Sequence, residues 1–302
     1  MSEDELGKVS TWFATSPLHR PDDSPPPSVS VDVDFGAHSR RGPLRSTNDD
    51  HYLIVRLGRY QEALLTSLPP ADVPRHFDER AYGMVIADGS GVAGEAASRL
   101  AITTLAHLLV YFGRWHVRVD EPIAEEVMDR AQRFYRGVDS TLLRSGHESG
   151  QSLRTTLTAV FTAGSELFFV HVGHSRAYVF RDDELMQLTH DHTVDRERPR
   201  KAAVVDVAPR ARDLHHTLTE ILGAGGSSPP RIDIERFGLL HGDVILLCTN
   251  GLTDVANDAQ IANALRLQGT PDDQCQALVD LAANSGCKDD VAAVVARYRI
   301  GD

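Results

Sequence analysis

The chain has 302 residues, of which 41% are hydrophobic and 25% charged, and its formal net charge is −12. This composition is typical of a folded globular protein and excludes a largely disordered one. The negative charge argues against nonspecific binding to nucleic acid or to an anionic membrane surface, and it suits a protein that collects cations.

The sequence has no basic-then-apolar signal peptide, and no uninterrupted apolar run approaches the roughly 20 residues that a membrane helix requires. Its cysteines, Cys248, Cys275 and Cys287, are odd in number and have no CxxC spacing, which is typical of reduced thiols. We therefore predict a cytoplasmic protein without a membrane segment, in which the cysteines pack in the core.

Residues 1–28 are predicted to form a flexible tail, because residues 21–28 are polar, acidic and rich in proline. Residues 29–302 are predicted to form one domain. Short runs of β-branched and aromatic residues recur along this domain and indicate many strands. In chain order they are VSVDVDFG, HYLIVRL, YGMVIAD, TTLTAVFTA, ELFFVHVG, RAYVFR, DVILLCTN and DVAAVVARYRI.

Helical spacing of apolar residues predicts a consecutive pair of helices near 94–115 and 122–145. Two further helices are predicted near 258–267 and 271–285, the second with acidic residues in its first turn. Strands and helices are thus grouped along the chain rather than strictly alternating. This grouping favours an α+β domain, with sheet packed on sheet and helices outside, over a doubly wound parallel sheet.

The strand YGMVIAD ends at Asp88 and runs into a glycine-rich turn, in which Gly89, Gly91 and Gly94 match the pattern GxGxxG. One interpretation is a dinucleotide site. Against it, Asp88 would place a carboxylate near the pyrophosphate, and no acidic residue ends a second strand about 20 residues later. In the other interpretation the glycines let the chain bend sharply, so that backbone carbonyls lie beside the Asp88 carboxylate and form a site for a hard cation.

Three other strand ends or adjacent turns carry similar oxygen ligands: Asn48-Asp49-Asp50, Thr249-Asn250-Gly251 and Asp289-Asp290. Together with Asp88 they could build an all-oxygen site for Mg²⁺ or Mn²⁺. Each of these segments alone also fits ordinary turn chemistry, because Asp and Asn beside Gly are common turn residues. Their order along the chain is therefore more informative than any one of them.

That order resembles the type 2C, metal-dependent Ser/Thr protein phosphatases (the PPM family) of bacteria, from about Val29 to Arg299. The segments that carry the resemblance are Arg45-Ser46-Thr47-Asn48-Asp49-Asp50, Ala87-Asp88-Gly89-Ser90-Gly91, Gly94-Glu95-Ala96-Ala97-Ser98, Thr155-Thr156, Val172-Gly173-His174-Ser175-Arg176-Ala177-Tyr178, Leu188-Thr189-His190-Asp191-His192, Leu247-Cys248-Thr249-Asn250-Gly251-Leu252-Thr253-Asp254 and Lys288-Asp289-Asp290-Val291.

The resemblance implies an antiparallel β-sandwich of two sheets flanked by helices, with a cleft for two Mn²⁺ or Mg²⁺ ions at one end. It implies that Asp88 bridges both metals and that Gly89 gives a backbone carbonyl to the first. Asp289 is implied as a ligand of the second metal, for which Asn250 also occupies a ligand position. Asp50 completes the implied metal site by holding metal-bound water.

The resemblance also assigns the catalytic residues Arg45, Asp49 and Asp50. Asp49 and Asp50 would hold metal-bound waters, and Arg45 would grip the substrate phosphate, for which a planar guanidinium is suited. From its spacing alone, Arg45 is better interpreted as an ordinary surface charge. The implied reaction is hydrolysis of phosphoserine or phosphothreonine in proteins by a metal-activated water.

The chain departs from the family pattern at three of these segments. Asn250 stands where the family has an acidic residue, and Asp290 stands where it has asparagine. His174 replaces a hard ligand of an accessory third metal by an imidazole, which prefers softer ions, so that a third metal is doubtful. These departures leave open a rival hypothesis, in which the domain is a weakly active or non-catalytic module that binds a phosphoprotein or a Ser/Thr kinase. The sequence makes no prediction of the oligomeric state.

The histidines of His190-Asp191-His192 and His215-His216 suggest a zinc site as a further alternative. No cysteine lies near them to complete a tetrahedral ligand set, so we expect His192 to order a turn instead. The segment from Thr193 to His215 corresponds in position to the family's flap beside the active site.

Overall fold

The computed structural model describes residues 31–65, 67–69, 76–113, 121–197, 217–226 and 228–301. The predicted tail, residues 1–28, lies outside these residues, as does most of the predicted flap. Across the described ranges, no helix combines the length and the apolar character that crossing a membrane would require.

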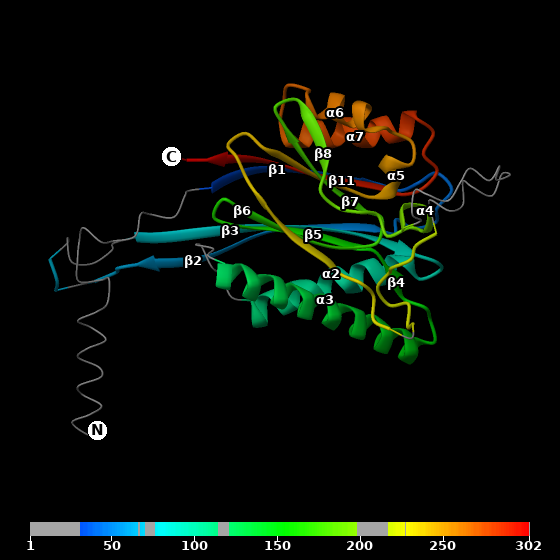
Figure 1. Cartoon of the computed structure of the whole chain (residues 1–302), viewed down its shortest axis with the longest axis horizontal. Coiled ribbons are helices and arrows are strands. Elements are labelled where there is room, and N and C mark those ends of the chain that lie inside the picture. Colours follow the sequence, from blue (N-terminus) through cyan, green and yellow to red (C-terminus); the bar gives the residue numbers. More distant parts are fainter. Residues whose placement is uncertain are drawn as a thin grey trace, which may run out of the picture.

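The strands form two antiparallel sheets that are stacked on each other (Figure 1). The five-stranded sheet has the order β1 (Val31–Arg40), β11 (Val291–Ile300), β10 (Val244–Cys248), β7 (Arg176–Arg181) and β8 (Glu184–Gln187). The six-stranded sheet has the order β2 (Asp50–Glu62), β3 (His76–Ser90), β5 (Leu157–Ala163), β6 (Glu166–Val172) and β9 (Asp233–Gly238), with β4 (Arg154–Thr155) paired to the end of β3.

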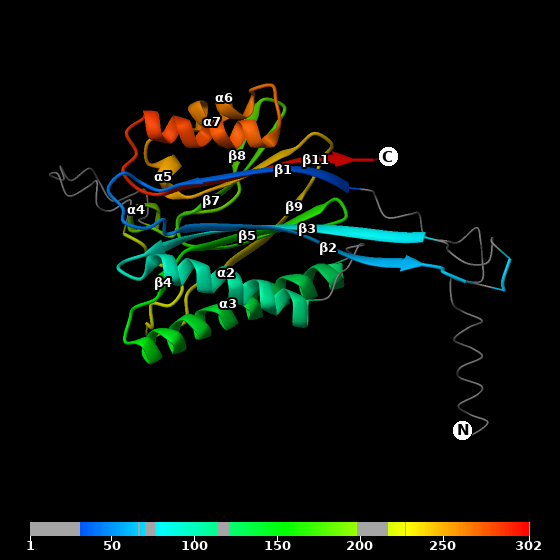
Figure 2. The same cartoon turned by 180° about the vertical axis from the view of Figure 1, so that it is seen from behind.

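Helices cover the outer face of each sheet, as the view from behind also shows (Figure 2). The long helices α2 (Gly94–Phe112) and α3 (Glu121–Ser149) pack on the six-stranded sheet. The helices α5 (Asn250–Thr253), α6 (Asp258–Leu265) and α7 (Pro271–Asn284) pack on the five-stranded sheet. A short helix, α4 (Val194–Glu197), follows the strand β8.

The alternation of side chains along β3 explains why both faces of its sheet are covered. Met84 and Ile86 point into the core between the two sheets. Val85 and Ala87 point the other way, into the core between the sheet and the helices α2 and α3. Because successive side chains of a strand lie on opposite faces, a continuous apolar run such as YGMVIA requires a layer on each side.

The predicted α+β sandwich is therefore confirmed. Every strand pair within the two sheets is antiparallel. This excludes the dinucleotide interpretation of the turn at Gly89, which needs parallel strands joined by a crossover helix. Cys248 and Cys275 are buried free thiols in the core of the five-stranded sheet and its helices, as predicted, and Cys287 packs at the edge of that core.

Two strands, β8 and β9, were not among the predicted runs. Their sequences, ELMQ and DIERFG, carry charged residues and are only partly buried. Both lie at an edge of a sheet, where one side of the strand is unpaired and charged residues are favourable. Most of the other predicted elements occur within a few residues of their expected ends, but β3 begins at His76, well before the predicted run at Tyr82, and α2 ends at Phe112 rather than near position 115.

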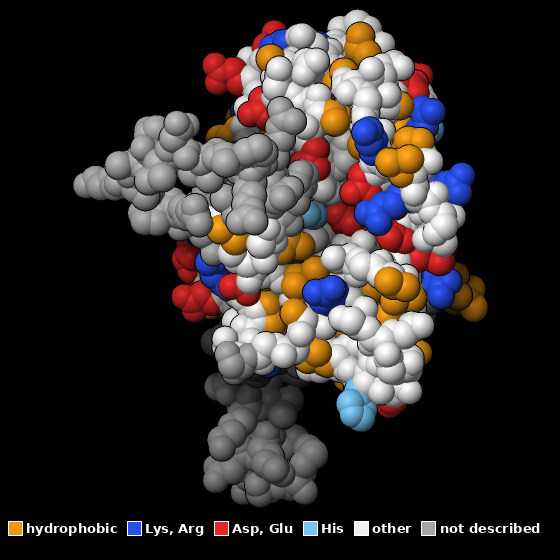
Figure 3. Space-filling model, turned by 90° about the vertical axis from the view of Figure 1, so that its right-hand side faces the viewer, with side chains coloured by type: hydrophobic (Ala, Val, Ile, Leu, Met, Phe, Trp, Pro, Cys, Tyr) orange, Lys and Arg blue, Asp and Glu red, His pale blue; other side chains and the backbone are white. Residues whose placement is uncertain are grey.

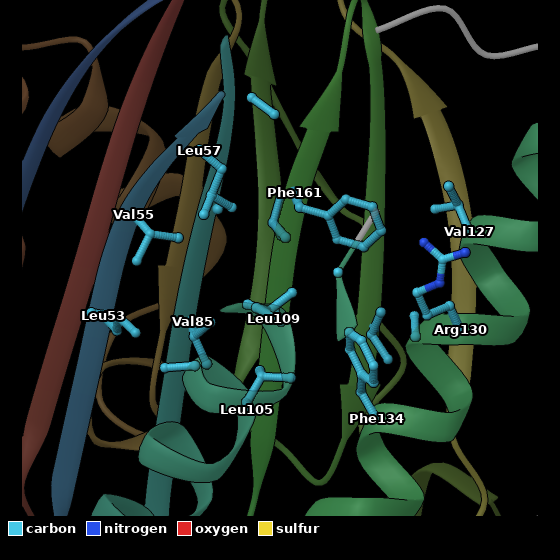
Figure 4. A pocket seen from close by; sticks show the side chains of 18 of the residues that line it. Leu53, Val55, Leu57, Val85, Leu105, Leu109, Val127, Arg130, Phe134 and Phe161 are labelled. Carbon is cyan, nitrogen blue, oxygen red and sulfur yellow. The ribbon is translucent and has the colours of Figure 1, made fainter. Parts of the chain in front are cut away.

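An apolar cavity of about 90 Å³ lies between the six-stranded sheet and its two helices (Figure 4). Leu53, Val55 and Leu57 of β2 line it from the sheet, and Leu109 and Phe134 line it from the helices. None of the predicted site residues contributes to this cavity.

Candidate metal centre

Asp50 begins β2 and Asp88 lies near the end of the neighbouring strand β3, and the register of β2 on β3 places them directly opposite each other. The Asp50 side chain is buried and that of Asp88 is 16% exposed. Burial, together with the charge of Asp289, raises the pKa of Asp88 to about 8. Burial and the charge of Asp88 likewise raise the pKa of Asp50 well above its usual value. Two carboxylates held opposite each other in this way repel, and a cation between them would relieve the repulsion.

Threonines fix both carboxylate-bearing residues. The hydroxyl of Thr249 donates to Asp50 Oδ2 at 2.7 Å and accepts from the backbone N–H of Ala292 at 2.9 Å. The backbone carbonyl of Asp88 accepts from the Thr155 hydroxyl and from the Thr156 N–H, both at 2.9 Å. The site is therefore built on strand ends whose backbone has little freedom to move.

The turn after Asp88 brings the start of α2 against the site. A Cβ atom at Gly89 would lie 1.9 Å from the carbonyl oxygen of Gly94, and one at Gly94 would lie 2.7 Å from Asp49 Oδ2. Both positions therefore require glycine. Asp49 is buried, and its other carboxylate oxygen accepts from the Thr47 hydroxyl at 2.9 Å. The close approach holds the Asp49 carboxylate at the N-terminal end of a 19-residue helix, where a negative charge is favourable.

Arg45 reaches the same place from the loop between β1 and β2. Its Nε donates to Asp289 Oδ1 at 2.7 Å, and its NH2 group lies 2.6 Å from the same oxygen. Asp290 has a different role, because its two carboxylate oxygens accept from the backbone N–H groups of Gly42 and Asp49, each at 2.8 Å. Asp290 thus ties the loop of Arg45 to the start of β11, and it still adds negative charge near Asp50 and Asp88.

Asn250 is the first residue of α5 and is buried. Its amide nitrogen donates to Asp254 Oδ2 at 3.0 Å. This contact directs the amide nitrogen toward Asp254. The amide oxygen remains as the atom that could ligate a cation.

His174 follows the strand β6, and its Nδ1 lies 3.9 Å from Asp88 Oδ2. Figure 3 shows acidic side chains gathered with a Lys or Arg side chain and a His side chain in a hollow at the end of the molecule where β3 and β4 meet. The predicted residues Arg45, Asp49, Asp50, Asp88, Gly89 and Asp289 thus come together from three separate parts of the chain.

The donor set fits a hard divalent cation, because it consists of carboxylate, carbonyl and amide oxygens. In the described part of the chain, no three His, Cys, Asp or Glu side chains are placed to hold one ion. The predicted set would not need three such groups around each ion, because in that prediction Gly89 would contribute a carbonyl, Asn250 would contribute an amide oxygen, and Asp49 and Asp50 would act through water. The raised pKa values of Asp50 and Asp88 show that the charged form of each carboxyl is unfavourable here, because the groups are buried among other carboxylates. A bound cation would stabilise the charged forms.

Residues 73–281, well over half of the chain, match the model of the Protein phosphatase 2C family. The chain belongs to the protein phosphatase 2C family. The serine/threonine protein phosphatase PstP of Mycobacterium tuberculosis is 30% identical over 280 residues, which are 89% of this chain and 45% of that relative. The phosphatase 2C chain thus spans about half the length of the PstP that it matches.

Solved structures agree with this family. The S. agalactiae serine/threonine phosphatase superposes with a TM-score of 0.69 at 22% identity, covering 88% of this chain and 99% of that one, which shows the shared fold. The catalytic domain of PstP in complex with two manganese ions has a TM-score of 0.63 at 26% identity, covering 89% of this chain and all of that domain.

Sequence reasoning did not assign the roles of three residues at the site: Thr249, which binds Asp50, Asp254, which binds Asn250, and Asp290, which binds backbone. All three lie within segments that carried the family resemblance, but spacing alone does not tell a ligand from a residue that holds a ligand. Among the described residues the zinc alternative finds no support, and His215 and His216 lie outside those residues. His192 is buried and orders a turn, as predicted, by accepting from the backbone N–H of Gly173.

Proposed function

We propose that this phosphatase 2C domain hydrolyses phosphomonoesters, and that its substrates are phosphoserine and phosphothreonine in proteins. The observation that carries this proposal is the convergence of Asp50, Asp88 and Asp289 with Arg45 at the strand ends. The substrate class follows the Ser/Thr protein phosphatase names of the relatives, PstP among them.

We infer that Mn²⁺ or Mg²⁺ binds through Asp88, the carbonyl of Gly89, Asp289 and the amide oxygen of Asn250. Asp49 and Asp50 would hold water at the site through their carboxylates. Divalent cations bound there would lower the pKa of a coordinated water and neutralise charge that develops during phosphoryl transfer. The two manganese ions of the PstP catalytic domain support this inference.

Arg45 is suited to orient the phosphate ester. Its guanidinium is fixed by Asp289, and its side chain remains 36% exposed, so that part of the donor fork stays accessible to a ligand. Phosphate oxygens accept well from such a planar fork, and Asp289 holds it in one orientation before substrate arrives.

A phosphoprotein substrate and a Ser/Thr kinase that generates it are the partners that this activity requires. We place the protein in the cytoplasm, in keeping with its free thiols. The rival hypothesis, a module that binds a phosphoprotein or a kinase without turnover, draws on Asn250, whose amide brings no charge to the metal site.

The test is hydrolysis of p-nitrophenyl phosphate and of a phosphothreonine peptide with Mn²⁺, with Mg²⁺ and with EDTA. We expect Mn²⁺-dependent turnover that Asp88→Ala abolishes, because this substitution removes the shared metal ligand. Asp32→Ala, on the exposed side of β1, is the control and should keep the wild-type rate. Equal rates for wild type and Asp88→Ala would contradict the proposal. Binding of metal and phosphopeptide without turnover would favour the rival hypothesis of a non-catalytic binding module.

A further inference from the structure

The turn that joins β6 to β7, Gly173-His174-Ser175, has a conformation that only its surroundings can maintain. Gly173 has a φ of +117°, a backbone angle that residues other than glycine rarely adopt. A Cβ atom there would lie 2.5 Å from the Cβ of Thr156. Gly173 therefore lets the turn pack directly on the residue that follows β4, beside Asp88.

Two buried histidines hold the peptide of Gly173. The carbonyl of Gly173 accepts from the backbone N–H of His192 at 2.7 Å and from His171 Nε2 at 3.0 Å. The N–H of Gly173 donates to His192 Nδ1 at 3.2 Å. Because a backbone N–H can only donate, His192 Nδ1 is the acceptor, and the ring proton of the neutral imidazole lies on Nε2.

Asp233, at the start of the edge strand β9, fixes that proton. Its Oδ2 lies 2.9 Å from His192 Nε2, and its Oδ1 lies 3.3 Å from Arg231 Nε. Burial acts to raise the pKa of Asp233, but the hydrogen bond from His192 and the electrostatic attraction of neighbouring groups such as Arg231 together outweigh it and leave the pKa below its usual value. The Asp233 carboxylate therefore orients the His192 imidazole, and this imidazole fixes the backbone of the turn at Gly173.

The other side of the turn is tied to Asp88 itself. The Ser175 hydroxyl lies 2.9 Å from the Thr156 hydroxyl, which accepts from the backbone N–H of Asp88 at 3.1 Å. The result is a chain of contacts from Asp233 to Asp88, with His174 in the middle. The His174 side chain is only 11% exposed, and its Nδ1 lies 3.9 Å from Asp88 Oδ2.

We propose that Asp233 and His192 are positioning residues, which act through Gly173 to hold the His174 imidazole against Asp88 and thereby set the affinity of the site for divalent cations. The proposal rests on the proposed function, because it assumes that Asp88 binds metal. Loss of a residue that holds a metal ligand in place without touching the metal commonly weakens metal binding by about 10–100-fold.

The experiment is a double-mutant cycle on Mn²⁺ affinity, measured by calorimetry with the full chain and without substrate. The four proteins are wild type, Asp233→Asn, His174→Ala and the double variant. Asp233→Asn keeps the shape of the side chain but removes the charge that orients His192. We expect it to weaken Mn²⁺ binding roughly tenfold in wild type and to have no further effect in the His174→Ala background, because the two act in series.

A matched control comes from Asp243, which is buried. Asp243 binds Arg181 through two hydrogen bonds of 2.7 and 2.6 Å, and Arg181 lies at the end of β7 that is opposite the turn. Asp243→Asn should lower the thermal stability and leave the Mn²⁺ affinity unchanged. If Asp233→Asn fails to fold, Asp233→Glu, which keeps the charge but displaces it, takes its place in the cycle.

The outcomes separate the two proposals. A wild-type protein that binds no Mn²⁺ would overturn the proposed function and this inference with it. Mn²⁺ binding that Asp233→Asn does not weaken, or weakens equally in both backgrounds, would overturn the inference alone. Thermal unfolding of each variant shows whether an effect on affinity exceeds a general loss of structure.

Discussion

At the scale of single residues, the contact between Asn250 and Asp254 decides what a carboxylate at position 250 would do. The amide of Asn250 supplies a proton to the Asp254 carboxylate at 3.0 Å. An aspartate in its place would bring two like charges together without that proton, and they would repel. A cation bound by the new carboxylate would remove the repulsion, so that the same change destabilises the metal-free protein and favours the metal-bound one.

Asn250→Asp should therefore lower the melting temperature of the metal-free protein and enlarge the rise in melting temperature that Mn²⁺ produces. If turnover is observed, the rate should also saturate at a Mn²⁺ concentration lower by about tenfold. Asn257→Asp, the same substitution at the N-cap of α6, is the control and should alter neither quantity. Superimposable Mn²⁺ titrations of wild type and Asn250→Asp would show that Asn250 is no ligand.

His171 gives the fold a dependence on pH. It is fully buried, with Nδ1 hydrogen-bonded to Thr158 and Nε2 to Gly173. Burial, with a further contribution from His192, lowers its pKa to about 3. The unfolded chain, with an ordinary histidine pKa of about 6.5, binds a proton that the folded chain excludes between these values. Its contribution to stability is therefore complete above about pH 6.5 and is lost as the pH falls toward about 3.

His171→Gln keeps an N–H donor and removes the titration. We expect the free energy of unfolding of wild type, relative to this variant, to fall by about 1.4 kcal/mol for each pH unit below about 6.5. Urea unfolding of both proteins at pH values between 4.5 and 8 measures the difference. A difference that does not change with pH would mean that His171 has the same pKa in the folded and the unfolded protein.

At the scale of elements, the pattern of apolar residues was enough to predict the central strands and all the long helices. β3, β6, β10 and β11 are buried on both faces and read as continuous apolar runs. The edge strands β8 and β9 are not predicted from the sequence. Their partly exposed, charged sequences have neither a run of apolar residues nor a clear alternation of apolar and polar residues. The short helices α4 and α5 depend on tertiary contacts, since four residues are too few to nucleate a helix alone.

The start of α7 is fixed by a reciprocal cap. The Thr270 hydroxyl accepts from the backbone N–H of Asp273, and the Asp273 carboxylate accepts from the backbone N–H of Thr270. Thr270→Ala should lower the free energy of unfolding by about 1 kcal/mol, while the Mn²⁺ affinity stays unchanged. The same substitution at Thr103, exposed within α2, should raise stability slightly because alanine is the better helix former. Urea denaturation of both variants checks the opposite signs.

At the scale of the whole molecule, the order of short segments along the chain predicted the sandwich, whereas no single segment did. The convergence of the candidate residues was predictable to the extent that they lie at or near strand ends, as Asp50 and Asp88 do. The roles of Asp290 and Asp254 were not predictable, because a carboxylate that binds backbone or an amide has the same sequence pattern as one that binds metal. Only the folded arrangement distinguishes them.

Deletion of residues 1–28 should leave the Mn²⁺-dependent rate nearly unchanged, because the described residues supply both sheets and every predicted site residue. The rate and the melting temperature of the shortened protein, compared with those of the full chain, measure this. Failure of the shortened protein to fold would place the domain boundary before residue 29.

The cavity between the six-stranded sheet and its helices is a place where hydrostatic pressure would act on the folded protein. Empty space inside a folded protein disappears when the chain unfolds and water enters, so pressure favours the open state in proportion to the void that is lost. About 90 Å³ of apolar void lies between β2 and the helices α2 and α3, so separating these helices from the sheet would reduce the volume of the protein and its solvent. Compression should therefore loosen these helices from their sheet.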